Sequence, residues 1–487
     1  MSTATVVLIT LVGYKLLLIA VGVWATRRNR SETDFFLGGR GLGPFVAGLS
    51  YAASTSSAWV LLGFSGFVYA VGLSALWMVP GIWAGYAVVW LYFGPQLRTE
   101  SLRFDQITPT DFVLQDAAGP SRAAAAALAA LLILFCFVFY IAAQFDAAGN
   151  ALAEHFSLSV PQAVILGAVI VVVYSLLGGF WAVSITDTIQ AVIMMLVALG
   201  VPLAALTAAG GFETMWSTLT QQMPANYLSL SGGHPGLVFA GFVIGLLGTS
   251  LGTLGQPQLL SRLMAVRGDK ERRQGFAIAI TWGVAVFLGM IVLGLSGRAL
   301  MPDLGNGETL FYAAANAYLP TVVAGIVIAA TLSAVMSTVD SILLAAAGAV
   351  AHDLGVNARL PGRELLASRL VMLSIAVVAV VLTLTLPDTI FNRVLFAWSA
   401  LGAAFGPIVL FRVMGRAVGG QAALLAMALG FGSCVLFYAL GTGPAGVDAG
   451  ALVRLATLPG DPFERAFPWV PPLLVLSLMC RARTQSG

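Results

Sequence analysis

Three runs of small and hydroxyl-bearing residues interrupt otherwise apolar segments of this chain. They are Ser50–Ala58 (SYAASTSSA), Gly248–Pro257 (GTSLGTLGQP) and Ser333–Ser341 (SAVMSTVDS). Hydroxyl and carbonyl oxygens are hard, weakly charged ligands that suit a monovalent cation, whereas Ca²⁺ usually recruits several carboxylates. We therefore expect these runs to contribute a site for a small hard cation.

The first two runs predict helices that break inside a membrane. Irregular backbone survives at bilayer depth only where it is buried in protein or lines a cavity. A pair of such interruptions, one in each half of a chain, indicates the binding site of a secondary transporter. The alternative for the first run is an intact helix in which the serines bond back to its own carbonyls.

The third run predicts a polar stripe on a helix. At 3.6 residues per turn, Ala334, Ser337, Thr338 and Ser341 share one face. The stripe indicates either cation ligands or polar contacts that hold neighbouring membrane helices together.

Ionisable residues within apolar segments are the next candidates, because they are costly in lipid and usually functional. Asp340 lies in mid-segment, whereas Asp187 lies near the start of one and is either a helix cap or part of an ion relay. We consider both, together with Thr55, as coupling or second-ion candidates. Lys15, in the first apolar segment, is expected to be structural. Tyr140 lines a substrate cavity or is a core tyrosine.

Composition places the chain in a membrane. Of its 487 residues, 59% are hydrophobic and only 9% are charged, and the net charge is +3. Soluble domains are about 25% charged. The charge is too small to suggest nucleic acid as a partner, and no arrangement of nucleophile, base and orienting residue predicts an enzyme.

Thirteen segments are long enough to cross about 30 Å of hydrocarbon: 4–26, 44–72, 75–95, 124–150, 161–178, 187–207, 236–260, 275–299, 319–349, 369–386, 391–411, 421–441 and 467–480.

The distribution of Lys and Arg predicts the orientation. If the N-terminus is outside, the inner loops hold nineteen basic residues, among them Arg262 and Arg412, and the outer loops hold four, among them Arg393. This bias predicts a multi-pass protein of the cell (inner) membrane with a cytoplasmic C-terminus.

Several of these motifs together resemble the sodium:solute symporter family, most closely its sodium/proline branch. The resemblance rests on matches in order from about residue 35 to 355. They are Phe35–Arg40 (FFLGGR), Leu42–Pro44, Leu49–Ser57 with Trp59 and Gly63, Gly178–Phe180 with Thr186–Gln190, Gly255–Pro257 and Met336–Thr338.

The resemblance implies an all-α membrane fold with a leucine-transporter-type core of two inverted five-helix repeats. The repeats would span 43–207 and 235–412, with an extra helix at 4–26 and two more within 421–480. It also implies a Na⁺ site and a substrate site beside it. The Na⁺ ligands would be the carbonyls of Ala53, Ser56 and Ala334 with the hydroxyls of Ser337 and Thr338, and the substrate would lie near Ser57, Gly63, Tyr140, Thr249, Thr253 and Gln256.

Three positions depart from the proline branch, which has aspartate at Thr55, methionine at Ser56 and tryptophan at Thr249. The function that the resemblance implies is Na⁺-coupled import of a small organic solute, such as the amino acid proline, by alternating access, with the monomer as the functional unit. The alternatives are coupling to protons, another substrate (a monocarboxylate, a sugar or urea), or a membrane sensor on the same fold.

Overall fold

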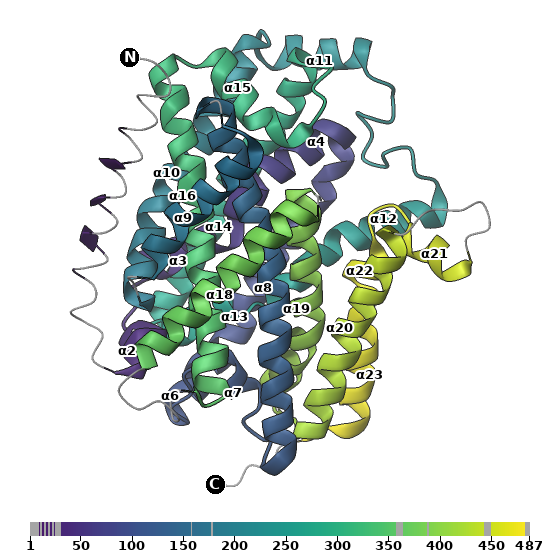
Figure 1. The fold of residues 1–487 in the computed structure, drawn as a ribbon. Coiled ribbons are helices and arrows are strands. Elements are labelled where there is room, and N and C mark those ends of the chain that lie inside the picture. The colour runs from purple at the N-terminus through teal and green to yellow at the C-terminus, as the bar shows by residue number, and fades with distance from the viewer. Residues whose placement is uncertain are drawn as a thin grey trace.

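The computed structural model describes isolated positions between residues 9 and 24 and then residues 31–156, 158–176, 179–356, 364–386, 389–442 and 450–482. These residues form a bundle of long helices that run between two ends (Figure 1). Short helices α11 (Gly211–Gln222) and α15 (Leu310–Tyr318) cover one end, called here the α15 end. Helices α2 (Glu32–Leu37), α6 (Gly94–Arg103) and α7 (Pro109–Val113) lie at the other, the α7 end.

The first half of the bundle runs from residue 44 to 208. Its elements are α3 (Pro44–Ala58), η2 (Trp59–Phe64), α4 (Ser65–Val71), η3 (Gly72–Trp77), α5 (Met78–Ala87), η4 (Val88–Phe93), α6, α7, α8 (Gly119–Phe156), α9 (Val160–Ser175) and α10 (Phe180–Ala208).

The second half begins after α11. Its elements are α12 (Gly236–Gly248), η5 (Thr249–Gly255), α13 (Pro257–Ala265), α14 (Asp269–Leu300), η6 (Gly307–Thr309), α15, α16 (Thr321–Gly348), η7 (Ala349–Asp353), α18 (Glu364–Thr385) and α19 (Ile390–Val413). The chain continues through β1 (Arg416–Ala417), α20 (Gly420–Thr442), α21 (Ala451–Ala456), α22 (Pro462–Arg465), η8 (Phe467–Trp469), α23 (Val470–Met479) and β2 (Arg481–Ala482).

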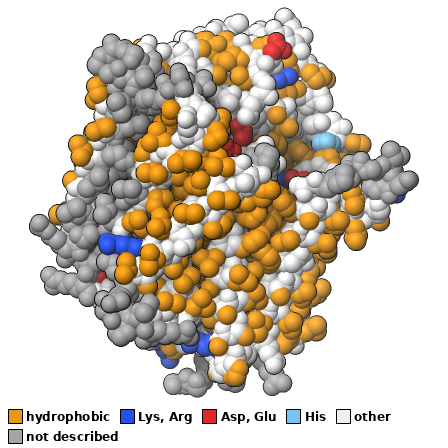
Figure 2. Space-filling view, viewed as in Figure 1, with side chains coloured by type: hydrophobic (Ala, Val, Ile, Leu, Met, Phe, Trp, Pro, Cys, Tyr) orange, Lys and Arg blue, Asp and Glu red, His pale blue; other side chains and the backbone are white. Residues whose placement is uncertain are grey.

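The surface of the bundle suits a lipid environment. Hydrophobic side chains cover most of the flank seen in Figure 2, with few charged ones among them. Nine helical stretches in the described part of the chain are long and apolar enough to cross a membrane, and one of them, Pro44–Arg103, contains two of the predicted spans. The predicted segment 161–178 forms the shorter helix α9. The total of thirteen remains a prediction, and the first span, with Lys15, falls outside the described residues.

The first predicted helix break is confirmed. Within α3, Ser57 has φ +21° and ψ −166°, a backbone conformation that interrupts the helix. Side chains then satisfy backbone groups near the break: Gln144 Oε1 on α8 accepts a hydrogen bond from the Ala58 N–H, and Ser57 Oγ accepts one from Trp59. Thr55 does bond back to the Tyr51 carbonyl, but the intact helix considered as the alternative is wrong.

The second predicted break is confirmed as well. Helix α12 ends at Gly248, a tight 3₁₀ segment follows, and Gln256 is extended at φ −78° and ψ 114° before α13 begins at Pro257. Glycines allow α19 to press directly on this segment: a Cβ added at Gly402 would lie 2.6 Å from the Gly252 Cα. Real Cβ atoms do not approach other atoms so closely, so both positions require glycine.

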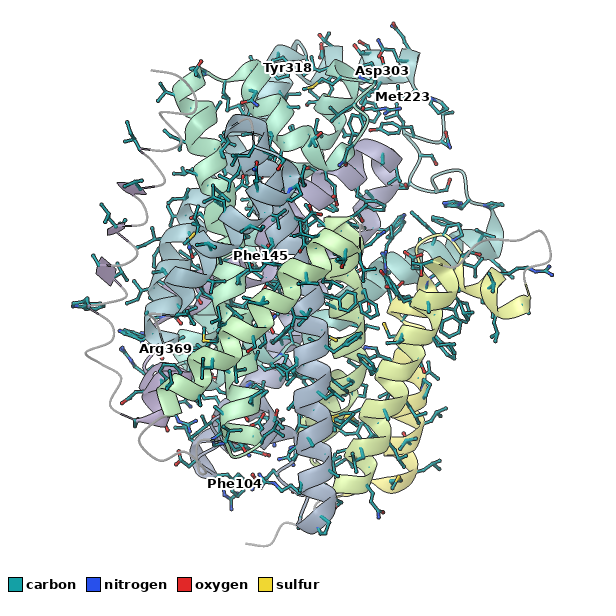
Figure 3. All side chains as sticks on the ribbon, in the orientation of Figure 1. Phe104, Phe145, Met223, Asp303, Tyr318 and Arg369 are labelled. Carbon is teal, nitrogen blue, oxygen red and sulfur yellow. The ribbon has the colours of Figure 1, made fainter. Side chains whose placement is uncertain are left out.

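Side chains fill the space between the helices along the whole bundle, from Phe104 near the α7 end to Met223, Asp303 and Tyr318 near the α15 end (Figure 3). Three arginines predicted in loops are buried in this interior instead. Arg262 and Arg412 are 1% and 0% exposed, and Arg393 is 2% exposed. Each is compensated by acids, which a count of basic residues along the sequence cannot detect: Arg412 pairs with Glu100 and Asp116, and Arg393 lies 3.7 Å from Asp146.

Candidate functional site

The two segments predicted to bind a cation lie side by side. Helix α3 starts at the α7 end, whereas α16 starts beside α15, so the two run in opposite directions (Figure 1). They are joined by a hydrogen bond of 3.0 Å between the hydroxyls of Ser54 and Ser341. One turn further toward the α15 end, α3 presents its break and α16 presents Ser337 and Thr338. The fold therefore places the runs 53–57 and 334–338 next to each other.

One donor atom of this pair of segments is buried and has no hydrogen-bond partner in the described structure. Thr338 Oγ1 is fully buried and makes no hydrogen bond with any described residue. Ser337 Oγ donates to the Ala334 carbonyl at 2.9 Å, which brings two of the predicted ligands together. A buried hydroxyl without a partner is costly in a native protein and usually indicates an ion, water or ligand. The ligand set itself remains a prediction.

Ser56 has a carbonyl that already accepts the N–H of Trp59. Its hydroxyl is buried and, like the Tyr86 phenol on α5, makes no hydrogen bond with any described residue. Thr55 donates to the Tyr51 carbonyl at 2.6 Å, and the rings of Tyr51 and Tyr86 pack edge to face, with centroids 5.1 Å apart. The Thr55 hydroxyl is therefore engaged within α3, and its role as a coupling candidate stays a prediction.

A second group of buried polar atoms surrounds Trp398 of α19. The Trp398 ring packs against Trp59 with centroids 5.5 Å apart, and its Cβ would meet a Cβ added at Gly252 at 2.8 Å. The phenol of Tyr140 on α8 lies within interaction range of Ser57 and Trp398. The Trp398 indole N–H and the Tyr140 hydroxyl make no hydrogen bond in the described structure. Trp398 thus connects the two helix breaks, and these unused polar groups are available to a solute.

The polar residues of the second break differ in whether their side chains already have hydrogen-bond partners. Thr249 Oγ1 and Gln256 Nε2 are buried and make no hydrogen bond with the described residues. Thr253 instead donates to the Ser250 carbonyl at 2.7 Å and packs against Gly85 of α5. Among the predicted substrate residues, Thr253 therefore faces a neighbouring helix.

Gly63 lies apart from Ser57. It lines a pocket that opens toward the α15 end together with Arg298 and Glu308, and a Cβ added to it would touch Phe391 at 3.3 Å. Asp340 is buried within α16, at 1% exposure. Ser57, Tyr140, Thr249 and Gln256 are all buried, at no more than 1% exposure, whereas Gly63 lines an outer pocket.

Asp187 belongs to a buried ion pair. It lies eight residues into α10, whose N-cap is Gly179, so the alternative that Asp187 caps this helix is wrong. Its Oδ2 lies 2.8 Å from an Nη of Arg262 on α13, and both side chains are at most 1% exposed. The same oxygen accepts the hydroxyl of Ser50 at 2.7 Å.

Hydroxyls complete this cluster. Arg262 donates to Ser50 at 2.9 Å and to Ser341 at 2.6 Å, and Ser54 donates to Asp187 at 3.3 Å. Residues Ser50, Ser54, Asp187, Arg262 and Ser341, called here the Asp187–Arg262 network, thus join α3, α10, α13 and α16. Each broken helix has one half that lies nearer the α7 end: α3 in the first broken helix and α13 in the second.

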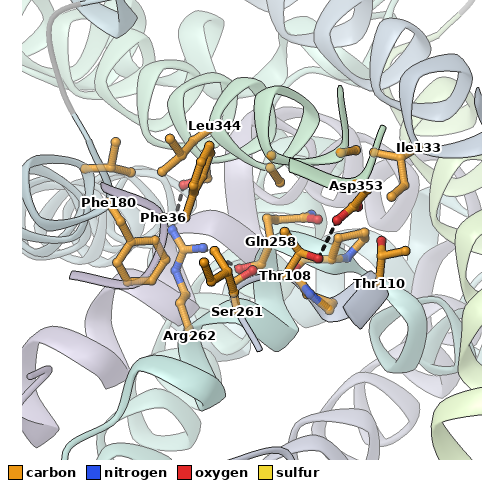
Figure 4. A pocket seen from close by; sticks show the side chains of 18 residues that line it. Phe36, Thr108, Thr110, Ile133, Phe180, Gln258, Ser261, Arg262, Leu344 and Asp353 are labelled. Carbon is orange, nitrogen blue, oxygen red and sulfur yellow. Dashed lines mark hydrogen bonds between the residues drawn. The ribbon is translucent and has the colours of Figure 1, made fainter. Parts of the chain in front are cut away.

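A pocket reaches this network from the α7 end. Its lining includes Phe36, Phe180, Gln258, Arg262 and Asp353 (Figure 4). The central residues beyond it are sealed: Ser57, Tyr140 and Gln256 have no exposed surface. The Gly63 pocket therefore lies toward the α15 end of a closed centre, and the pocket lined by Arg262 lies toward the α7 end.

Sequence reasoning missed Arg262 and Trp398. Arg262 follows the second break in a segment that reads as a basic loop, although its position on a helix five residues after Pro257 could have suggested burial. Trp398 lies in an apolar segment where one more aromatic residue carries no distinguishing signal.

Comparisons with known sequences indicate a family. The profile of the sodium:solute symporter family matches residues 35–430. The osmoregulated proline transporter of Bacillus subtilis is 32% identical over 445 residues, which are 89% of each chain. The sodium/proline symporter of Staphylococcus aureus is 33% identical over 411 residues, 82% of this chain and 79% of that protein.

Comparison with solved structures agrees on the fold. A Na⁺-coupled sialic acid symporter in a substrate-bound outward-open state superposes with a TM-score of 0.79 at 15% identity, covering 98% of this chain and 99% of the other. At this identity the likeness shows the fold alone. The predicted all-α, leucine-transporter-type fold class is confirmed.

Proposed function

This chain belongs to the sodium:solute symporter family, and we propose that it is a secondary active transporter that couples the entry of Na⁺ to import of proline or a closely related small amino acid. The observation that carries the proposal is the meeting of two broken helices, at Ser57 and at Thr249–Gly255, around buried polar atoms that no described residue satisfies. Such breaks supply carbonyls and half-helix ends to ions and substrates at bilayer depth.

The proposed Na⁺ ligands come from both halves of the chain. Ala53 and Ser56 belong to the first half, and Ala334, Ser337 and Thr338 belong to the second. An ion shared between them stabilises one arrangement of the halves, the one in which the substrate site is complete. Ion and solute then favour the same state, so each tightens the binding of the other by the same factor.

We propose that the α7 end is cytoplasmic and that the Asp187–Arg262 network closes it. The network joins α3 and α13 to α10 and α16, between the closed centre and the pocket at the α7 end. Release of solute to the cytoplasm requires α3 and α13 to separate from α10 and α16, and hence this network to rearrange. In this proposal Asp187 acts on coupling through Arg262, and Asp340 stays a second candidate.

The substrate class follows from the groups at the centre and from the relatives. Indole N–H and phenol O–H groups at Trp398 and Tyr140 are suited to the carboxylate of an amino acid, and the aromatic faces of Trp59 and Trp398 to a small apolar ring. Relatives named for proline transport are 32% and 33% identical. Thr249 stands where the proline branch has tryptophan, so the tests below include other solutes.

The experiment is uptake into proteoliposomes. With an inward Na⁺ gradient, labelled proline is expected to accumulate above its external concentration, and an inward K⁺ gradient of equal size is the control. Uptake driven equally well by either cation would refute Na⁺ coupling.

Two further arms separate the alternatives. Accumulation that follows an inward proton gradient without Na⁺ would select proton coupling. Na⁺-dependent stabilisation of the purified protein by a monocarboxylate, a sugar or urea, but not by proline or other amino acids, would retain Na⁺ coupling and reject the proposed substrate.

A further inference from the structure

A cluster of metal-ligating side chains lies at the α7 end, apart from the central site. It consists of Asp111 on α7 with His352 and Asp353 on η7, whose nearest ligand atoms all lie within 4.8 Å of one another. His352 Nε2 is 2.9 Å from Asp111 Oδ2. These three residues, called here the Asp111–His352–Asp353 cluster, are not among the proposed Na⁺ or solute ligands.

The carboxylates are held in place by their own hydrogen bonds. Asp111 closes a capping box at the start of α7, where its Oδ2 accepts the N–H groups of Ile107 and Thr108. Thr108 Oγ1 donates to Asp353 Oδ1 at 2.6 Å. Outer hydrogen bonds of this kind orient metal ligands before the ion arrives. The cluster is therefore a preorganised group rather than a chance gathering of acids.

One ligand atom is buried and unused. Asp353 Oδ2 is shielded from solvent and accepts no hydrogen bond from any described residue. A buried carboxylate oxygen without a donor is costly, and a cation removes that cost. Two pockets meet at Asp353, one of them also lined by Asp111, Arg122 and His352, so an ion from the α7 side has a path to it.

The charges around the cluster suit a cation. Asp111 Oδ2 lies 2.9 Å from His352 Nε2, and its other oxygen, Oδ1, lies 3.6 Å from Arg122. Asp353 adds a second carboxylate within 4.8 Å of Asp111 and His352. The cluster thus holds two carboxylates beside one imidazole, with one arginine at its edge.

We propose that Asp111, His352 and Asp353 bind a divalent transition metal ion such as Zn²⁺ or Mn²⁺. One imidazole nitrogen and two carboxylate oxygens form a donor set typical of these ions, with further positions left for water from the pocket.

The site joins two separate parts of the chain. Asp111 lies between α6 and α8 in the first half, whereas His352 and Asp353 lie in η7, directly after α16, in the second. An ion bound here stabilises the contact between α7 and η7 and hence the closed α7 end. Occupancy of the site is expected to raise the unfolding temperature and, on the cytoplasmic side, to slow transport.

The test is metal binding to the purified full-length protein in detergent after treatment with EDTA. Titration calorimetry with Zn²⁺ and Mn²⁺ is expected to show one site, and thermal unfolding is expected to shift upward. His352→Gln and Asp353→Asn should each weaken binding by about tenfold to a hundredfold. His234→Gln, which changes a histidine next to Phe242 in the second half, is the matched control and should bind as the wild type does.

Equal metal affinity in all variants, or no saturable binding to the wild type, would overturn the proposal. So would stabilisation by mild acid alone in EDTA with no effect of metal, which would make the cluster a proton site. Co²⁺ provides a test that needs no variant: ligation by His352 gives visible absorption bands that Zn²⁺ removes. Failure of Co²⁺ to develop such bands would contradict the site, whatever the outcome of the transport assays.

Discussion

The carboxylate of Asp187 on α10 and the guanidinium of Arg262 on α13 lie 2.8 Å apart, and both side chains are at most 1% exposed. They are 75 residues apart in sequence. Two charges taken out of water repay their desolvation only when they are paired and their remaining donors and acceptors are satisfied. Ser50 and Ser54 donate to Asp187 Oδ2, and Ser50 and Ser341 accept from Arg262, whereas Asp187 Oδ1 accepts no hydrogen bond from any described residue. The pair and its hydroxyl partners therefore link α3, α10, α13 and α16, so its loss weakens the packing of all four helices.

Removing one partner of this pair is expected to destabilise the protein strongly. Asp187→Asn leaves the Arg262 charge buried and uncompensated, which costs about 3–5 kcal/mol. The double variant Asp187→Asn/Arg262→Gln should lose less than the sum of the two single variants, because no charge is left alone. The measurement is chemical or thermal unfolding of the purified protein.

Arg273→Gln is the control for that experiment. Its pair with Asp269 is 3.0 Å long but largely exposed, and such pairs are worth about 0–1 kcal/mol. Strictly additive losses at Asp187 and Arg262 would show that the two side chains are not coupled.

Removing the Thr338 hydroxyl is expected to weaken Na⁺ binding. Thr338→Val keeps the shape and deletes the ligand oxygen, and an interaction of a neutral group with a charge is worth about 1.5–3 kcal/mol, or about tenfold to a hundredfold in the Na⁺ concentration for half-maximal uptake. Ser337→Ala should act in the same direction, and Thr338→Ser should restore most of the affinity.

Thr331→Val is a matched control on the same helix. Thr331 is fully buried as well, but its hydroxyl donates to the Val327 carbonyl within α16. Its Na⁺ dependence should remain that of the wild type. Unchanged Na⁺ dependence in both Thr338→Val and Ser337→Ala would reject the assigned ligands.

Removing the unused donors near the first break is expected to weaken solute binding. Tyr140→Phe and Trp398→Phe delete the phenol and indole donors, and each should raise the KM for solute by about twofold to tenfold, equivalent to about 0.5–1.5 kcal/mol. The measurement is initial uptake at saturating Na⁺.

Trp282→Phe separates this effect from a general loss of packing. The Trp282 indole donates to the Ala191 carbonyl at 2.8 Å, so its removal should lower stability and leave KM unchanged. If Trp282→Phe and Trp398→Phe had the same effect on KM, the role of Trp398 in the solute site would be refuted.

The contact between α19 and the second break predicts that Gly402 accepts no side chain. A Cβ at Gly402 would lie 2.6 Å from both the Gly252 Cα and the Leu251 carbonyl oxygen. Gly402→Ala is expected to destabilise the protein by about 1–3 kcal/mol, as overpacking does. On α20, Gly432 has no atom within 4 Å of an added Cβ, so Gly432→Ala should stabilise by about 0.5–1 kcal/mol. Unfolding of the two variants under one condition compares them, and equal stability would contradict the close contact.

Local chemistry along the chain was sufficient to predict the membrane class, both helix breaks and the polar stripe on α16. Runs such as Ser54–Ser57 and Gly252–Gly255 are incompatible with a smooth helix in lipid, and this incompatibility can be read one segment at a time. The same reading identified Asp187 and Thr338 as buried polar residues of interest, because hydrophobic context is a local property.

Reading one segment at a time could not predict which of these residues contact one another. Along the sequence Arg262 is the first residue of a basic loop, and only the fold of α13 places it against Asp187. Trp398 is one aromatic residue among many until α19 packs on Gly252. Asp111 and His352 come from different halves of the chain and become neighbours only when α7 reaches the end of α16. Burial and pairing depend on distances between remote segments, and those distances are a property of the packed helices rather than of any stretch of sequence.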